Sequence, residues 1–224
     1  QYQNGALDKH APKLPEKMGL VTEVAAAQCD IAAAALAAGL TNVVTISSGL
    51  GGLMGKYSGI CTGDGHGLGH GGVDKDLPFK RKFEPLSHYH NYLASQAARV
   101  LTKLQETKEG TGTMLDNTLL VFMSDSANQQ HSWRNANWPI VLVGDLGGNL
   151  KTGQFVSYPV KAQRAGGDGG GEVFGTAFGT NPLTNALYAT LLTAVGKPCD
   201  AFNRSPSSSE AKEVHAPLPE LLNR

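Results

Sequence analysis

Three side chains of the kind that bind metals lie close together in one glycine-rich stretch, Asp64-Gly-His66-Gly-Leu-Gly-His70. Carboxylate oxygens and imidazole nitrogens are ordinary ligands of divalent metal ions, and the glycines allow closely spaced side chains to converge on one ion. The stretch therefore predicts one half of a metal site. The spacing equally allows a loop whose histidines are only solvated.

A second pair of candidate ligands, Asp125 and His131, follows the apolar run Leu119–Met123. Such a run is typical of a buried strand, and ligands of α/β proteins sit beyond the carboxyl ends of strands. An Asp and a His on one such loop can share a metal, and Arg134 beside them could contact an oxyanion. The alternative is that Asp125 caps a turn and His131 hydrogen-bonds to its neighbours.

Two other groups of residues are weaker candidates for a functional site. His88 and His90 form a pair at the expected start of a helix, where residues two apart point in different directions, so a shared ligand role is not expected. Asp168 and Glu172 could bind calcium, although two acids in a glycine-rich loop are far from a full ligand set. A dinucleotide-binding fingerprint, a phosphate-binding P-loop and a nucleophile elbow are all absent from the sequence, which disfavours several common enzyme classes.

Helices and apolar strands alternate along the chain. The spacing of apolar residues predicts helices over 16–38, 87–108 and about 181–195. Short apolar or β-branched runs predict strands over 42–48, 119–123, 138–143 and 153–160. In the first helix the predicted apolar stripe includes Val24, Ala27 and Ile31, and Gly39 supplies the stop. We therefore expect an α/β fold with a mixed, mostly parallel sheet flanked by helices.

The composition is that of a globular protein with one core. We expect an extended arm over 1–15, the α/β domain over 16–202 and an extended tail over 203–224. Lys plus Arg and Asp plus Glu both number 19, so no general field attracts nucleic acid. No apolar run is long enough for a membrane span. The chain begins with Gln1 rather than Met, so we expect further residues upstream.

The three cysteines are Cys29, Cys61 and Cys199, and none forms a C-x-x-C pair. This spacing argues against zinc ribbons, c-type haem attachment and thioredoxin chemistry. It leaves open one disulfide with one free thiol, or three thiols in the core.

The order of motifs over residues 16–202 resembles the carboxyl-terminal half of a bacterial secreted family of unknown function, the one numbered fifteen-fifty-two, and its sister family numbered fifteen-oh-one. The segments that carry the resemblance include Gly67-Leu-Gly-His70-Gly-Gly72, Gly112-Thr-Met-Leu-Asp-Asn-Thr118, Ser124-Asp125, Asn137-Trp-Pro-Ile-Val-Leu-Val-Gly144, Leu150-Lys-Thr-Gly153 and Asn185-Ala-Leu-Tyr-Ala-Thr-Leu-Leu192.

These families are similar to the sulfatase-like and alkaline-phosphatase-like superfamily, whose members hydrolyse phosphate or sulfate esters with one or two bound metals. The resemblance implies a partial alkaline-phosphatase-like domain, exported to the periplasm or the cell exterior. It also implies a divalent metal, which could be zinc, calcium or magnesium. On this reading His66 and His70 fall on the family's His-rich motif, and Asp125 and His131 on its strand-end motif.

Two departures from the family pattern define the alternative function. Gly71 stands where the pattern has a second adjacent His, and the superfamily's nucleophile region has no counterpart in this chain. We therefore expect the missing amino-terminal half, another protein or a second copy in a homo-oligomer to cover the sheet. The alternative is a non-catalytic structural or assembly protein of the cell surface that retains the fold.

Overall fold

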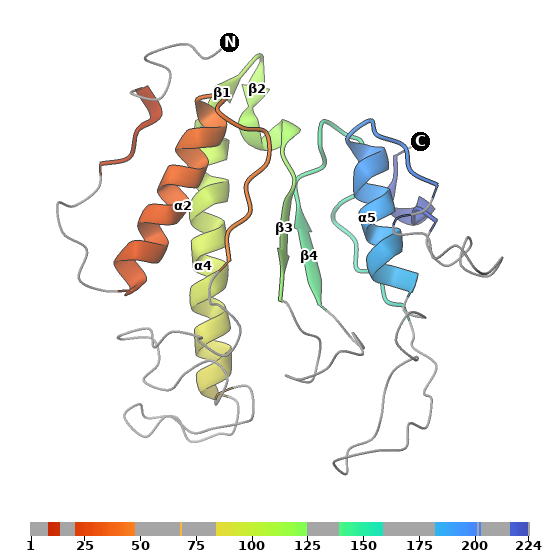
Figure 1. Ribbon diagram of the computed structural model, residues 1–224, viewed down its shortest axis with the longest axis horizontal. Coiled ribbons are helices and arrows are strands. Elements are labelled where there is room, and N and C mark those ends of the chain that lie inside the picture. Colours follow the sequence, from red (N-terminus) through yellow and green to blue (C-terminus); the bar gives the residue numbers. More distant parts are fainter. Residues whose placement is uncertain are drawn as a thin grey trace. The chain divides into compact units, whose positions relative to one another are not determined.

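The computed structural model describes residues 9–13, 21–47, 68, 84–124, 139–158, 182–200, 202 and 216–223. The chain divides into two compact units, Gln1–Leu115 and Asp116–Arg224. Helices account for most of the regular structure that Figure 1 labels, with short strands between them. The predicted boundaries of the arm, the domain and the tail stay predictions.

The first unit is built on two helices, α2 (Val21–Ala37) and α4 (Glu84–Glu106), which lie side by side (Figure 1). Both were predicted from apolar spacing. Gly39 ends α2 as expected, since its φ of 67° is a left-handed conformation that glycine adopts without a Cβ penalty. α4 begins three residues before the predicted start at residue 87, because Glu84 and Pro85 suit a first helical turn.

The face that α2 buries is made of small side chains. The most buried are Ala27, Cys29, Ala32, Ala33 and Ala34, each under 9 % exposed. Small side chains allow two helix backbones to approach closely. Val24 and Ile31 of the predicted stripe are instead 39 % and 49 % exposed. Apolar residues occur all round this helix, so their spacing does not define which face is buried.

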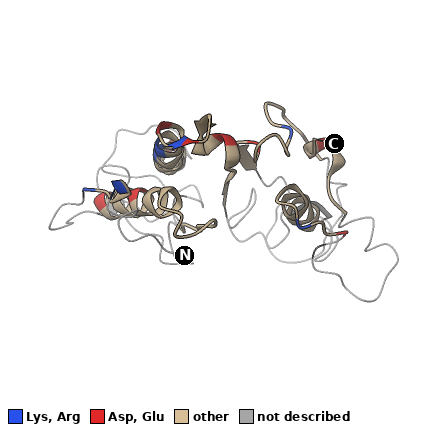
Figure 2. Cartoon of the chain, turned by 90° about the horizontal axis from the view of Figure 1, so that it is seen from above, with Lys and Arg blue, Asp and Glu red and all other residues tan. Residues whose placement is uncertain are grey.

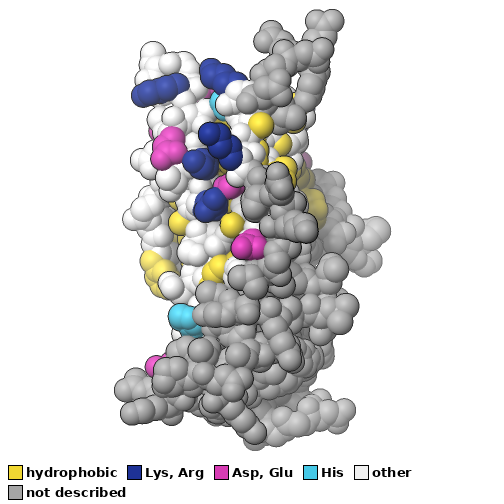
Figure 3. All heavy atoms as spheres, turned by 90° about the vertical axis from the view of Figure 1, so that its left-hand side faces the viewer, with side chains coloured by type: hydrophobic (Ala, Val, Ile, Leu, Met, Phe, Trp, Pro, Cys, Tyr) yellow, Lys and Arg dark blue, Asp and Glu magenta, His cyan; other side chains and the backbone are white. Residues whose placement is uncertain are grey.

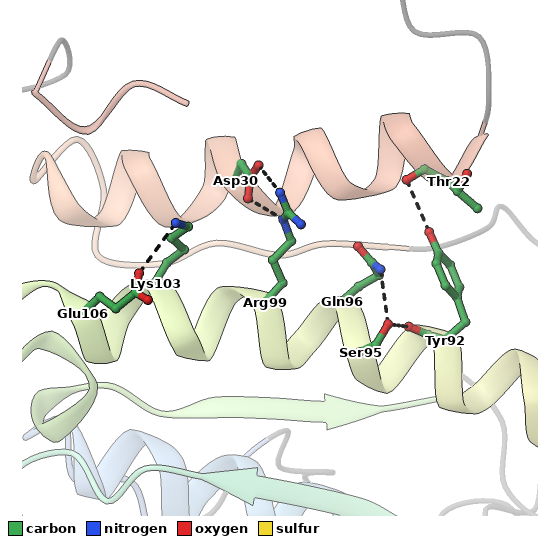
Figure 4. A network of polar contacts seen from close by, with 8 residues as sticks. All are labelled: Thr22, Asp30, Tyr92, Ser95, Gln96, Arg99, Lys103 and Glu106. Carbon is green, nitrogen blue, oxygen red and sulfur yellow. Dashed lines mark hydrogen bonds and ion pairs between the residues drawn. The ribbon is translucent and has the colours of Figure 1, made fainter. Parts of the chain in front are cut away.

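Polar contacts join the two helices along their length (Figure 4). Arg99 donates two hydrogen bonds to Asp30, from Nε to Oδ1 at 2.6 Å and from Nη2 to Oδ2 at 2.7 Å. Nearer the amino-terminal ends, the Tyr92 hydroxyl donates to the Thr22 carbonyl oxygen at 3.5 Å. Residue numbers rise together along both helices at these contacts, so α2 and α4 run parallel to each other.

The predicted strand over 42–48 does not form in the residues that the structure describes there, 42–47. Val43 is 78 % exposed, and the Thr41 hydroxyl both accepts from its amide and donates to its carbonyl oxygen. β-Branched residues favour a strand only when a neighbouring strand supplies hydrogen bonds and packing. The first unit pairs only β1 (Lys108–Glu109) with β2 (Gly112–Thr113) among its described residues.

The second unit contains the two longer strands, β3 (Leu120–Met123) and β4 (Ile140–Val143). Both were predicted, but they pair antiparallel, with Leu120 opposite Val143 and Met123 opposite Ile140. They are half-buried or exposed rather than buried on both faces. The described residues therefore form a mixture of helices and small antiparallel sheets, and a mostly parallel sheet is not found among them. A continuous apolar run does not encode strand direction.

The core of the second unit gathers around Leu150, Ala194 and Leu222. Ala194 ends α5 (Pro182–Ala194), the third predicted helix, which carries no charged residue (Figure 2). Leu222 belongs to the segment predicted as an extended tail. That segment instead forms η2 (Pro219–Leu221), a turn of 3-10 helix, in the described residues 216–223. The predicted strand over 153–160 is also absent from its described part, 153–158.

Hydrogen bonds fix this carboxyl-terminal segment in place. The buried Thr190 hydroxyl donates to the Ala186 carbonyl oxygen and accepts from the Leu218 amide, both at 2.7 Å. The Tyr158 hydroxyl donates to the Glu220 carboxylate. Partial burial, followed by this hydrogen bond, raises the pKa of Tyr158. The apolar and polar contacts together make residues 218–222 part of the second unit's core.

Replacing Asp30 tests the contact between α2 and α4. Hydrogen bonds from Arg99 lower the pKa of the Asp30 carboxyl. The pair therefore stabilises the fold above the ordinary carboxyl pKa of about 4, and its contribution is lost as the pH falls through the lower folded-state value. We expect Asp30→Asn to reduce the free energy of unfolding by about 1 kcal/mol at neutral pH, since Arg99 is partly exposed. Urea unfolding from neutral pH to about pH 3 should show this difference shrinking.

Glu106→Gln is the matched control. Glu106 lies 3.6 Å from Lys103 on the same helix, and both side chains are more than half exposed. This exposed pair should contribute no more than about 0.5 kcal/mol. Equal effects of the two substitutions at every pH would contradict the role assigned to Asp30.

Candidate functional site

Leu68 is the one residue of the Asp64 to His70 stretch that the structure describes. Its side chain is 2 % exposed and packs with Tyr89 and Tyr92 of α4 in a hydrophobic cluster. Ala25, Leu86 and Leu93 pack around that cluster. A buried leucine side chain contributes about 2 kcal/mol by removal from water. The chain is therefore anchored in the core of the first unit at Leu68.

The first turns of α4 provide this attachment. Tyr89 and Tyr92 are three positions apart, so both side chains lie on one face of the helix. Tyr92 is 9 % exposed, and its ring covers Leu68 while its hydroxyl bonds to the backbone of α2. The contact between Tyr92 and Thr22 thus links the surroundings of Leu68 to the helix pair.

Two histidines flank Tyr89 on the same helix. His88 and His90 are both exposed, and the rings of Tyr89 and His90 lie with their centroids 6.0 Å apart at 42°. Neighbouring protein atoms exclude water from part of the His90 ring, and this desolvation lowers the pKa of His90. A lowered pKa keeps the imidazole neutral, the form that binds metals. The expectation that these two histidines do not share a ligand stays a prediction.

The second candidate segment begins where β3 ends. Met123 is the last residue of β3, Ser124 follows it, and Asp125 is next in the sequence. The predicted strand before Asp125 is therefore confirmed, although it pairs with an antiparallel neighbour.

All six predicted site residues lie outside the part of the chain that the structure describes. They are Asp64, His66, His70, Asp125, His131 and Arg134. Asp168 and Glu172 lie outside it as well. The roles assigned to these residues stay predictions. In the described ranges, His, Cys, Asp and Glu side chains form no group of three or more that could hold a metal ion.

The cysteines supply no site in the described residues. Cys29 is a free thiol buried on α2, and Cys199 is half-buried. Desolvation, and then the neighbouring Asp30 carboxylate, raise the pKa of the Cys29 thiol. A raised pKa disfavours the reactive thiolate, so Cys29 is a packing residue. Cys61 lies outside the described ranges.

Comparisons with known proteins found no matching family model, no matching curated protein and no matching solved structure. None of the helices in the described part of the chain is both long and apolar enough to cross a membrane.

Sequence reasoning missed the role of Leu68. The signal was present, because Leu68 is the only large apolar residue within a run of glycines, histidines and one aspartate. A single apolar side chain in such a polar segment has a partner only if the fold brings one to it. That partner, the Tyr89 and Tyr92 pair, lies 21 or more positions further along the chain.

Replacing Leu68 tests this attachment. We expect Leu68→Ala to lower the free energy of unfolding by about 2–4 kcal/mol, because it leaves a cavity against Tyr89 and Tyr92. Leu40→Ala is the matched control, since Leu40 is 36 % exposed and should cost less than about 1 kcal/mol. Chemical denaturation of the two variants measures both values. A Leu68 variant as stable as the wild-type chain would show that the leucine is not held in the core.

Proposed function

We propose that this chain is an exported, metal-binding domain of the sulfatase-like and alkaline-phosphatase-like type. Its ligands would be Asp64, His66, His70, Asp125 and His131. The single observation that best supports the proposal is the burial of Leu68 against Tyr89 and Tyr92 of α4. His66 and His70 stand two residues before and after it in the sequence, so a core contact is available to hold this histidine segment.

The donor types indicate which metal to expect. Three imidazoles with two carboxylates favour zinc, since calcium and magnesium prefer sites made wholly of oxygen. A bound divalent ion would act as a Lewis acid toward a phosphoryl or sulfuryl oxygen. In this proposal Arg134 contacts an oxyanion of the substrate, where a guanidinium donates two parallel hydrogen bonds.

Hydrolysis requires a nucleophile in addition. We propose that the superfamily's amino-terminal half supplies it and adds strands to form the mostly parallel sheet predicted from the alternation of helices and apolar strands. Exposed apolar side chains of the described residues support a covering partner, among them Val43 at 78 % and Val141 at 51 % exposure. A second copy of the chain in a homo-oligomer is the other partner that this proposal allows.

The second candidate function is a structural or assembly protein of the cell surface. Gly71 favours it, since a His at that position belongs to the family pattern. The same exposed apolar side chains would then form its contacts with other proteins. The two candidates differ in one measurable respect: only the first hydrolyses a phosphate or sulfate monoester when metal is supplied.

Metal binding by purified chain tests the proposed site. We expect wild-type protein to bind zinc, and His70→Ala and His131→Ala each to weaken it by about tenfold or more, because each removes a ligand. Isothermal titration calorimetry with zinc, together with elemental analysis of dialysed protein, measures this.

His10→Ala is the control, because His10 lies in the described segment 9–13, far from both motifs in the sequence. It should bind zinc as the wild type does. Unchanged zinc affinity in both His70→Ala and His131→Ala would refute the ligand assignment, whatever the outcome of an activity assay.

A further inference from the structure

A cavity of about 280 Å³ lies in the first unit, beside the last turns of α2 and α4. Three segments line it: the short stretch 10–13, the second half of α2 and the end of α4. The lining residues are His10, Ala11, Pro12, Lys13, Asp30, Ala33, Ala34, Ala37, Arg99, Lys103 and Thr107. None of them belongs to the two candidate metal-binding segments.

The charged side chains of this cavity are mostly basic. Lys13, Arg99 and Lys103 are cationic, and Asp30 is the one carboxylate in the lining. Arg99 and Lys103 are four positions apart on α4 and therefore share a helix face. Figure 3 shows Lys and Arg side chains gathered in the upper half of this side of the molecule, with a His among them. The basic residues thus converge from two separate segments of the chain.

The one carboxylate is already engaged. Both oxygens of Asp30 accept hydrogen bonds from Arg99, through Nε and Nη2. This bidentate pair fixes the guanidinium, whose Nη1 makes no hydrogen bond to the residues that the structure describes. Lys103 has a 3.6 Å ion pair with the exposed Glu106, a contact that solvent weakens. Asp30 therefore neutralises one of the three cations and leaves an excess of positive charge.

The shape of the cavity also suits a small ligand. Ala33 and Ala34 are buried and leave space where larger side chains would fill it. The volume is close to the lower end of the range for ligand pockets, about 300 Å³. Thr107 adds a hydroxyl, which itself donates to the Lys103 carbonyl oxygen at 2.8 Å and can accept from a ligand or water.

We propose that this cavity binds a small oxyanion of the phosphate class, either free phosphate or the phosphate group of a small ester. Lys13 and Lys103 would donate charge-assisted hydrogen bonds to its oxygens, and Arg99, held by Asp30, would present Nη1. Phosphate oxygens favour such a convergence of ammonium and guanidinium donors. No lining residue of this cavity is a proposed metal ligand, so this proposal does not depend on the metal site.

Phosphate binding by metal-free protein tests the proposal. Inorganic phosphate is titrated into chelator-treated chain by calorimetry, and glycerol phosphate forms a second arm that distinguishes the free anion from an ester. We expect the double variant Lys13→Gln/Lys103→Gln to bind at least about fourfold more weakly, since each removes one partly exposed charge contact.

Lys9→Gln/Lys108→Gln is the matched control. Like the test variant, it removes two positive charges, one within residues 9–13 and one near the end of α4. Both lysines are exposed and do not line the cavity. This control should bind phosphate within about twofold of the wild type. Equal weakening in both double variants would overturn the proposal, because it would show a general charge effect.

A second measurement uses the wild-type chain alone. Phosphate should slow the acetylation of Lys13 and Lys103, followed by mass spectrometry, while Lys9 and Lys108 react at unchanged rates. The proposal fails if metal-free chain binds neither anion at tens of millimolar, or if phosphate protects all four lysines alike. Binding that requires added zinc would also overturn it and would assign the anion to the metal site instead.

Discussion

The close approach of α2 and α4 is the constraint on which the first unit depends. Alanines on the buried face of α2 permit it, and the Asp30 and Arg99 pair fixes the alignment of the helices. Because the helices run parallel, their amino-terminal ends come together beside Leu68 and their carboxyl-terminal ends beside the basic cavity. Both the burial of Leu68 and the cavity follow from one helix pair.

The sequence predicted the helices of this fold well and its strands less well. Apolar spacing located α2, α4 and α5, and Gly39 ended α2 as predicted, because these signals act within a few residues. Strand pairing depends on residues far apart in the chain, so a continuous apolar run indicated β3 without its antiparallel direction. The run containing Val43 lacks a strand partner among the described residues, and its strand propensity alone does not form a strand.

In the candidate site, too, the sequence predicted the local features and not the contacts between distant segments. The composition of the segment around His66 and His70 indicated metal chemistry, because that inference needs only the identity of neighbouring side chains. The attachment of Leu68 to Tyr89 needs a fold that joins distant segments, and the basic cavity joins Lys13 to Lys103 across 90 positions. Contacts of that sequence separation leave no periodic signal in a single chain.

The central claim is that two separate segments hold one metal ion. X-ray absorption spectroscopy of zinc-loaded chain tests it most directly, because the spectrum counts the imidazoles around the zinc. The account predicts a mixed shell of histidine and oxygen ligands that loses one imidazole in His70→Ala and one in His131→Ala. A zinc spectrum that His131→Ala leaves unchanged would contradict it, since the second segment would then not contribute to the site.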